Sequence, residues 1–139
     1  MDYLCDCAKT VSIKAVITER GKLLVVSTSH HNHSHWDLPG GRMACSEDIF
    51  DTLKREIKEE LGISRFSFEK RPRFVFSWYN KKVKTHGIVI GFPVKLSSYK
   101  FKAADKNVKE IHWVRFKDIK KLDIAGLLKP HYVRIFAST

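Results

Sequence analysis

The sequence predicts a mixed α/β or α+β domain, because strand-like segments stand both before and after one strongly amphipathic helical segment at residues 47–61. A second helical pattern closes the chain at residues 124–136. The chain has 139 residues, and 43% of them are hydrophobic, which is enough for an ordinary core. We therefore expect a single domain over residues 1–139.

The first elements are two short strands. Residues 11–18 alternate between apolar and polar side chains, and residues 22–27 form a short apolar run. Both patterns are typical of strands. Between them, Glu19, Arg20 and Gly21 predict a hairpin turn.

A polar loop at residues 28–35 follows, and it contains His30, His31, His33 and His35. Such histidines can bind a transition metal, but in a polar loop they usually stay solvated. The loop lies next in sequence to the Trp-Asp-Leu-Pro-Gly-Gly stretch at residues 36–41, so a contact between His35 and a substrate is a third interpretation.

The helical segment has clear end signals. Ser46 is a good N-cap, and Glu47 and Asp48 place negative charge on the first turn. Gly62 stands where a left-handed C-terminal residue is expected. The predicted helix therefore covers residues 47–61.

Three glutamates occupy costly positions on this helix. Its apolar stripe contains Ile49, Phe50, Leu53, Ile57 and Leu61. At about 100° per residue, Glu60 projects inside that stripe, Glu56 lies on its border, and Glu59 lies slightly further round. A carboxylate that faces a core needs a cation, and three close carboxylates repel one another. The simpler interpretation is a solvated helix with ion pairs such as Arg55 with Glu59.

The second half of the chain is rich in strand patterns. Residues 66–79 and 83–96 predict two long strands joined through residues 80–82. Pro72 and Pro93 are expected to interrupt or end strand pairing, because proline donates no backbone hydrogen bond.

The last segments are shorter. Residues 97–109 are polar and without periodicity, which predicts a loop, and residues 110–116 resemble a strand again. Residues 117–122 predict a helical turn. Residues 124–136 predict a helix that is broken near Pro130.

The positive charge is unevenly placed. The formal net charge is +11 at pH 7. Between Lys70 and Lys121 the acidic residues are Asp105, Glu110 and Asp118, while Lys and Arg are far more numerous. Such a field attracts phosphates on a nucleotide or on RNA. It also raises solubility without any ligand.

Several features indicate a soluble cytoplasmic protein with no membrane partner. No apolar run reaches the roughly 18 to 20 residues that span a bilayer, and the N-terminus lacks a basic-then-apolar signal. Cys5, Cys7 and Cys45 have no four-ligand zinc spacing, so we expect reduced thiols, with a soft-metal site at Cys5 and Cys7 as the alternative. The sequence does not give the oligomeric state, and a homodimer stays open.

A longer pattern spans the 23 residues from Gly41 to Ile63. It reads Gly41, five residues, Glu47, seven residues, Arg55-Glu56-Ile57, one residue, Glu59-Glu60, one residue, Gly62-Ile63. This stretch resembles the Nudix hydrolase family, because every fixed position of that family's signature is present. Ala44 and Ser46 stand where many members have glutamate and glycine, but neither position belongs to the strict signature.

The resemblance implies a fold and a reaction. The Nudix fold is a mixed β-sheet sandwiched between α-helices. Nudix enzymes cleave the phosphoanhydride bond of a nucleoside diphosphate linked to another group, as in an NTP, an oxidised nucleotide, ADP-ribose or another nucleotide sugar. Mg²⁺ is the expected cofactor, with Mn²⁺ as a substitute, because hard oxygen ligands suit both ions.

The resemblance also implies roles for the signature residues. Glu56, Glu59 and Glu60 would hold the metal together with the carbonyl of Gly40. Glu59 is the expected base for the attacking water, with Glu110 or Asp105 as outside candidates.

The other signature residues would shape the site. Arg55 and Glu47 would orient the helix and its carboxylates, so we group Arg55 with the catalytic glutamates. Gly41 and Gly62, with Glu47, are structural positions of the motif.

Aromatic residues at period two suggest a base-stacking surface. Phe74, Phe76 and Trp78 alternate along one predicted strand, although such a stripe is more often simply core. Phe76, Trp78, His35 and Glu110 are the candidate substrate contacts.

Two other functions stay open. One is a non-catalytic Nudix-fold module that binds RNA or nucleotides; such modules commonly lose motif glutamates, and this chain keeps all of them. The other is an RNA-end (cap) hydrolase, which rests on the positive charge alone.

Overall fold

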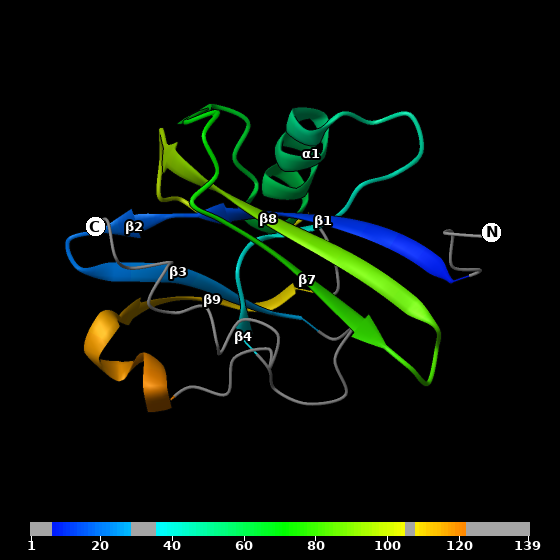
Figure 1. Cartoon of the computed structure of the whole chain (residues 1–139). Coiled ribbons are helices and arrows are strands. Elements are labelled where there is room, and N and C mark those ends of the chain that lie inside the picture. Colours follow the sequence, from blue (N-terminus) through cyan, green and yellow to red (C-terminus); the bar gives the residue numbers. More distant parts are fainter. Residues whose placement is uncertain (1–6, 29–35, 105–107, 122–139) are drawn as a thin grey trace.

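The computed structural model describes residues 7–28, 36–104 and 108–121. Its elements, in chain order, are β1 (Ala8–Val16), β2 (Thr18–Glu19), β3 (Lys22–Thr28), β4 (Trp36–Asp37), β5 (Gly40–Arg42), α1 (Ile49–Leu61), β6 (Phe66–Phe68), β7 (Phe74–Asn80), β8 (Thr85–Leu96), β9 (Val108–Arg115) and the 3₁₀ helix η1 (Phe116–Lys121) (Figure 1).

The strands form two sheets, one of them mixed. The five-stranded sheet has the order β5-β1-β8-β6, and β7 also pairs with β8. In it, β1 and β8 run parallel, whereas β5, β6 and β7 pair antiparallel with their neighbours. In the second sheet β3 pairs with β2, β4 and β9. The expected mixed α/β fold is confirmed.

Two hydrophobic cores lie on opposite sides of the strands, because alternate residues of a strand face opposite ways. Figure 1 shows α1 against one face of the five-stranded sheet. The core under α1 contains Ile13, Ala15, Ile17, Leu24, Val26, Leu53, Ile57, Leu61, Ile63, Phe92, Val94 and Leu96. The second core contains Val16, Leu23, Val25, Leu38, Phe74, Val89, Val114 and Ile119. The apolar stripe predicted for the helix is thus a core face.

The helix begins later than its sequence suggests. Asp48, not Ser46, is the N-cap, and α1 starts at Ile49. Asp48 and Asp51 form a reciprocal capping box, in which the Asp51 N–H donates to Asp48 Oδ1 at 2.8 Å. Ser46 has a φ of 69° and therefore belongs to the preceding turn. The predicted C-terminal glycine is confirmed, since Gly62 has a φ of 72° and donates to the Lys58 carbonyl.

The two prolines behave differently. Pro72 separates β6 from β7, as expected. Pro93 lies inside β8, but strand pairing changes around it, as expected. It stands opposite Val16 in the last pair of the β1–β8 ladder. On the other edge of β8, pairing with β7 ends at Gly91 and pairing with β6 begins at Val94. Its missing N–H therefore falls in a gap of the ladder.

The turns agree with the sequence. Arg20 and Gly21 have φ values of 49° and 77°, which suits the tight turn between β2 and β3. The predicted helical turn after β9 is η1. The histidine loop, Asp105 and the predicted helix at residues 124–136 lie outside the described residues.

One of the two described cysteines differs from expectation. Cys45 is free and exposed, whereas Cys7 is disulfide-bonded. The expectation of reduced thiols is therefore wrong for Cys7, because spacing along a chain does not show which thiols meet. In the described part of the chain, no helix is long and apolar enough to cross a membrane.

Candidate functional site

The site is built where a glycine turn meets the helix. β5 is paired with β1, with Gly40 opposite Lys14 and Gly41 opposite Ile13. Gly40 has a φ of 140°, and a Cβ there would collide with the Ile13 carbonyl. A Cβ on Gly41 would collide with the Glu56 carboxylate. Glycine is needed at residue 40 because of its positive φ and its close approach to β1, and at residue 41 because the Glu56 carboxylate lies against the backbone.

Glu60 points from α1 into this turn. It is 4% exposed, and its Oε1 accepts a hydrogen bond from the Gly40 N–H at 2.7 Å. Burial raises the pKa of Glu60 to about 8; the charge of Lys14 and the Gly40 N–H act against this rise, while Glu56 adds to it. The prediction that Glu60 is a carboxylate inside the apolar stripe is therefore confirmed.

Lys14 brings a cation to the same place from β1. Its Nζ lies 3.0 Å from Asp37 Oδ2 and 3.5 Å from the Leu38 carbonyl oxygen. Burial alone would lower the pKa of Lys14, but the charges of Asp37, Glu60 and Glu56 outweigh that effect and raise it. Lys14 is therefore a protonated, nearly buried ammonium group beside the carboxylates.

A second charged cluster lies at the start of the helix. Glu47 Oε2 accepts from Arg55 Nε at 2.6 Å, and Glu47 Oε1 accepts from Arg55 Nη2, the Ala44 N–H and Thr52 Oγ1. The Arg55 guanidinium, followed by the Ala44 N–H, lowers the pKa of Glu47 to about 2. The hydrogen bond to Glu47 is likewise the main reason that the pKa of Arg55 is raised. Arg55 also donates to the Arg42 carbonyl, so this cluster ties β5 to α1.

Arg55 links the two clusters. Its Nη1 lies 2.8 Å from Glu56 Oε1 and 3.4 Å from Glu59 Oε2. Glu56 therefore has a cation on one side and Glu60 on the other. Within the described ranges, no three acidic, histidine or cysteine side chains are placed so that they could hold a metal ion together.

The donor set nevertheless fits a hard divalent cation. Glu56 and Glu60 are neighbours one helical turn apart, and the charge of Glu56 raises the cost of ionising Glu60. A cation with oxygen ligands would relieve that repulsion, and Mg²⁺ and Mn²⁺ both take carboxylate oxygens. Glu59 is 44% exposed, and among the described residues its side chain contacts Arg55 at 3.4 Å, so it is able to turn toward the pair.

The other predicted site residues lie elsewhere. Gly62 caps the far end of α1. Phe76 and Trp78 are partly buried against the second core, on the other side of the strands from α1. Glu110 on β9 is exposed, with His112 Nε2 at 3.9 Å from its carboxylate. His35 lies outside the described residues.

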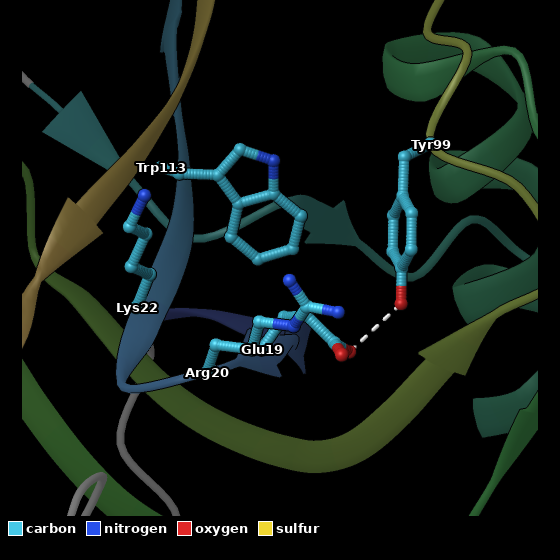
Figure 2. Close-up of a pocket in the computed structure, with 5 residues that line it drawn as sticks. All are labelled: Glu19, Arg20, Lys22, Tyr99 and Trp113. Atoms are coloured by element: carbon cyan, nitrogen blue, oxygen red, sulfur yellow. Dashed lines mark hydrogen bonds between the residues drawn. The ribbon is translucent and has the colours of Figure 1, made fainter.

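A cavity of about 350 Å³ is lined by residues other than Glu56, Glu59 and Glu60 (Figure 2). It is bounded by Glu19, Arg20, Lys22, Tyr99 and Trp113. The Tyr99 hydroxyl donates to Glu19 Oε2 at 2.8 Å, and the Arg20 side chain lies between the two aromatic rings in Figure 2. None of these residues belongs to the motif.

Sequence reasoning missed Lys14 and Asp37. A lysine in the middle of an apolar strand was the available signal, since Lys14 stands between Ile13 and Ala15. Nothing in the sequence shows that Asp37 would meet it, because the pair is formed by strand placement across 23 positions.

Comparison with known proteins gives a consistent family. The sequence matches the profile of the NUDIX domain over residues 8–134. Phosphatase NudJ from Escherichia coli K12 is 33% identical over 54 residues, which cover 39% of this chain and 35% of NudJ. The chain therefore spans about a third of the length of the curated relatives it matches.

Solved structures share the fold across most of the chain. A NUDIX hydrolase from Nitrosomonas europaea superposes with a TM-score of 0.77 at 20% identity, covering 94% of this chain and 89% of that one. The NUDIX domain of Shewanella oneidensis NrtR, solved with ADP ribose, superposes with a TM-score of 0.71 at 19% identity, covering 91% and 87%. At these identities the likeness establishes the fold alone.

Proposed function

The chain belongs to the NUDIX family, and on that premise we propose that it is a Mg²⁺-dependent hydrolase of a nucleoside diphosphate linked to another group. The observation that carries this proposal is the pair of acidic groups Glu56 and Glu60, held together beside the backbone of Gly40 and Gly41. Like charges at a buried position are costly, and here the fold retains them.

Glu56, Glu60 and Glu59 would hold the metal, with the carbonyl of Gly40 as a further ligand. When bound, Mg²⁺ or Mn²⁺ supplies neutralisation of the diphosphate charge. Glu47 and Arg55 would orient the helix and its carboxylates. Arg55 contacts Glu47, Glu56 and Glu59, so it fixes the helix turn that carries the ligands.

Glu59 would accept the proton from the attacking water. Its side chain is more exposed than those of Glu56 and Glu60, and a base must reach a water at the substrate side. The water would attack one phosphorus of the diphosphate, and the bond from that phosphorus to the bridging oxygen would break. A nucleotide sugar would then yield a nucleoside monophosphate and a sugar phosphate.

The substrate class is proposed from charge and from the aromatic residues. Nucleoside triphosphates, oxidised nucleotides, ADP-ribose and other nucleotide sugars all contain the required anhydride, and the NrtR domain binds ADP ribose. Phe76 and Trp78 stay candidate stacking residues for a base, and they lie against the second core, on the other side of the strands from α1. His35 and Glu110 stay candidate contacts. We also propose that residues 1–139 act as one cytoplasmic domain, with a homodimer left open.

The main alternative is an RNA-directed protein, either an RNA-end hydrolase or a non-catalytic binding module. It is motivated by the net charge of +11. Salt distinguishes the two cases. For a small nucleotide, kcat/KM falls moderately with salt and RNA binding stays weak, whereas an RNA-directed protein binds RNA tightly with a steep salt dependence.

The test is a substrate panel in ¹⁸O-labelled water with Mg²⁺ or Mn²⁺. The panel contains nucleoside triphosphates, oxidised nucleotides, ADP-ribose, nucleotide sugars, dinucleoside polyphosphates and capped RNA. We expect cleavage at a phosphoanhydride, with label in one product's phosphate and none on a sugar carbon. Faster release of phosphate from a simple phosphomonoester than from every diphosphate would overturn the proposal.

A further inference from the structure

Lys14 is the charged group that the proposed chemistry leaves without a role. Its side chain is 13% exposed and that of its partner Asp37 is 17% exposed. A nearly buried ion pair is costly to assemble, since both charges lose water. Its place is also specific, because Lys14 of β1 stands opposite Gly40 of β5, and the Gly40 N–H donates to Glu60.

The charges around Lys14 do not balance locally. Asp37 Oδ2 lies 3.0 Å from Lys14 Nζ, and Asp37 Oδ1 accepts a hydrogen bond from the Leu38 N–H at 2.7 Å. Glu60 accepts from the N–H of Gly40, the residue opposite Lys14 in the β1–β5 pair, and the charges of Glu60 and Glu56 both act on the ammonium group. Asp37 therefore takes part of the Lys14 charge away from Glu60 and Glu56, and Glu56 is also paired with Arg55.

We propose that Lys14 is a built-in cation of the metal site, which partly neutralises Glu56 and Glu60 and thereby weakens divalent-cation binding, with Asp37 setting how strongly it does so. This inference rests on the proposed function, because it concerns the same carboxylates. Lys14 is a positioning residue in this scheme, since it acts through Glu56 and Glu60.

The proposal predicts opposite effects for the two members of one ion pair. Lys14→Met removes a positive charge beside the site, so divalent cations should bind about tenfold more tightly. Asp37→Asn leaves Lys14 free to act on the glutamates, so binding should weaken by a factor of about three or more. A merely structural ion pair would give the same direction of change in both variants, because either one breaks it.

The measurement is Mn²⁺ binding followed by electron paramagnetic resonance of the free ion, at low and at high salt. Lys54→Met is the matched control, because Lys54 is an exposed lysine on α1. Its effect should be small and should vanish at high salt, whereas the effect of the nearly buried Lys14 should persist. In metal-free protein, Lys14→Met should also melt earlier than wild type, and Mn²⁺ should raise its Tm by more.

Two further variants keep the outcomes separate. If Lys14→Met does not fold, Lys14→Met combined with Asp37→Asn removes both charges and should still bind Mn²⁺ more tightly than Asp37→Asn alone. If Glu56→Gln with Glu60→Gln leaves Mn²⁺ binding unchanged, the proposed metal site itself is wrong. If that pair abolishes binding but Lys14→Met binds like wild type, or if Lys14→Met and Asp37→Asn shift affinity in the same direction, this inference alone is overturned.

Discussion

The two ends of α1 treat their carboxylates in opposite ways. Near its start, Glu47 receives hydrogen bonds from Arg55, the Ala44 N–H and Thr52, and its pKa falls to about 2. Near its end, Glu60 is buried beside Glu56 with one backbone donor, and its pKa rises to about 8. The residue type does not distinguish Glu47, Glu56 and Glu60, because all three are glutamates of one motif.

The difference separates a structural carboxylate from a functional one. A carboxylate that the protein satisfies with its own cations stabilises the fold and has no capacity left for a ligand. A carboxylate that the protein buries without full compensation destabilises the metal-free fold and is available to bind a cation. The comparison thus predicts that changes at the two ends have opposite consequences for activity and stability.

The largest expected effect is on turnover at the end of the helix. Glu60→Gln and Glu56→Gln should each lower kcat by at least about a hundredfold, because each removes a charge that stabilises the transition state through the metal. Steady-state kinetics in Mg²⁺ on the best substrate of the panel measures this. Full activity of either variant would sink the assignment. Lys58→Met, an exposed substitution on the same helix, is the control and should keep activity.

A smaller loss is expected from Gly41→Ala. A Cβ at residue 41 would collide with the Glu56 carboxylate, which is the movable end of a side chain, so Glu56 must shift while the backbone stays. We expect about a tenfold loss of kcat with little change in Tm. Adding Gly41→Ala to Glu56→Gln should cause no further loss, as a double-mutant cycle would show. Additive losses would mean that Gly41 acts through another group.

The local pattern predicted more of the motif than of its surroundings. Gly62, the apolar stripe and the inward Glu60 follow from helical periodicity and cap chemistry, which depend on neighbouring residues only. Ser46 was the wrong N-cap, since Asp48 and Asp51 complete a reciprocal pair that Ser46 cannot form. The Lys14–Asp37 pair depends on which strands become neighbours, and periodicity carries no information about that.

At the start of the helix, the main expected effect is on stability. Arg55→Met should lower Tm by roughly 5 °C, because it leaves Glu47 without its main partner and removes hydrogen bonds to Glu56 and the Arg42 carbonyl. Thermal melting in EDTA separates this from metal effects. Glu60→Gln is the informative comparison and should melt at or above wild type in EDTA. If Arg55→Met melts like wild type, the first cluster is not structural.

The smallest expected effect is a difference in pH dependence, and its sign follows from the two pKa shifts. Glu60 has a pKa raised from 4.5 to about 8, so the folded state binds its proton more tightly, and the stability from this group is lost as pH rises between those values. Glu47 has a pKa lowered from 4.5 to about 2, so its contribution is present above 4.5 and is lost as pH falls toward 2.

Of Glu60 and Glu47, therefore, only Glu60 changes the metal-free stability between about pH 5 and pH 9. The Tm of Glu60→Gln minus that of wild type, measured in EDTA, should grow by a few degrees across this range, since Gln carries no proton to lose. Saturating Mg²⁺ should shrink that growth, because the metal stabilises the ionised wild-type carboxylate. A difference that stays flat with pH in EDTA would show that Glu60 is as well compensated as Glu47, and the contrast between the two ends of α1 would disappear.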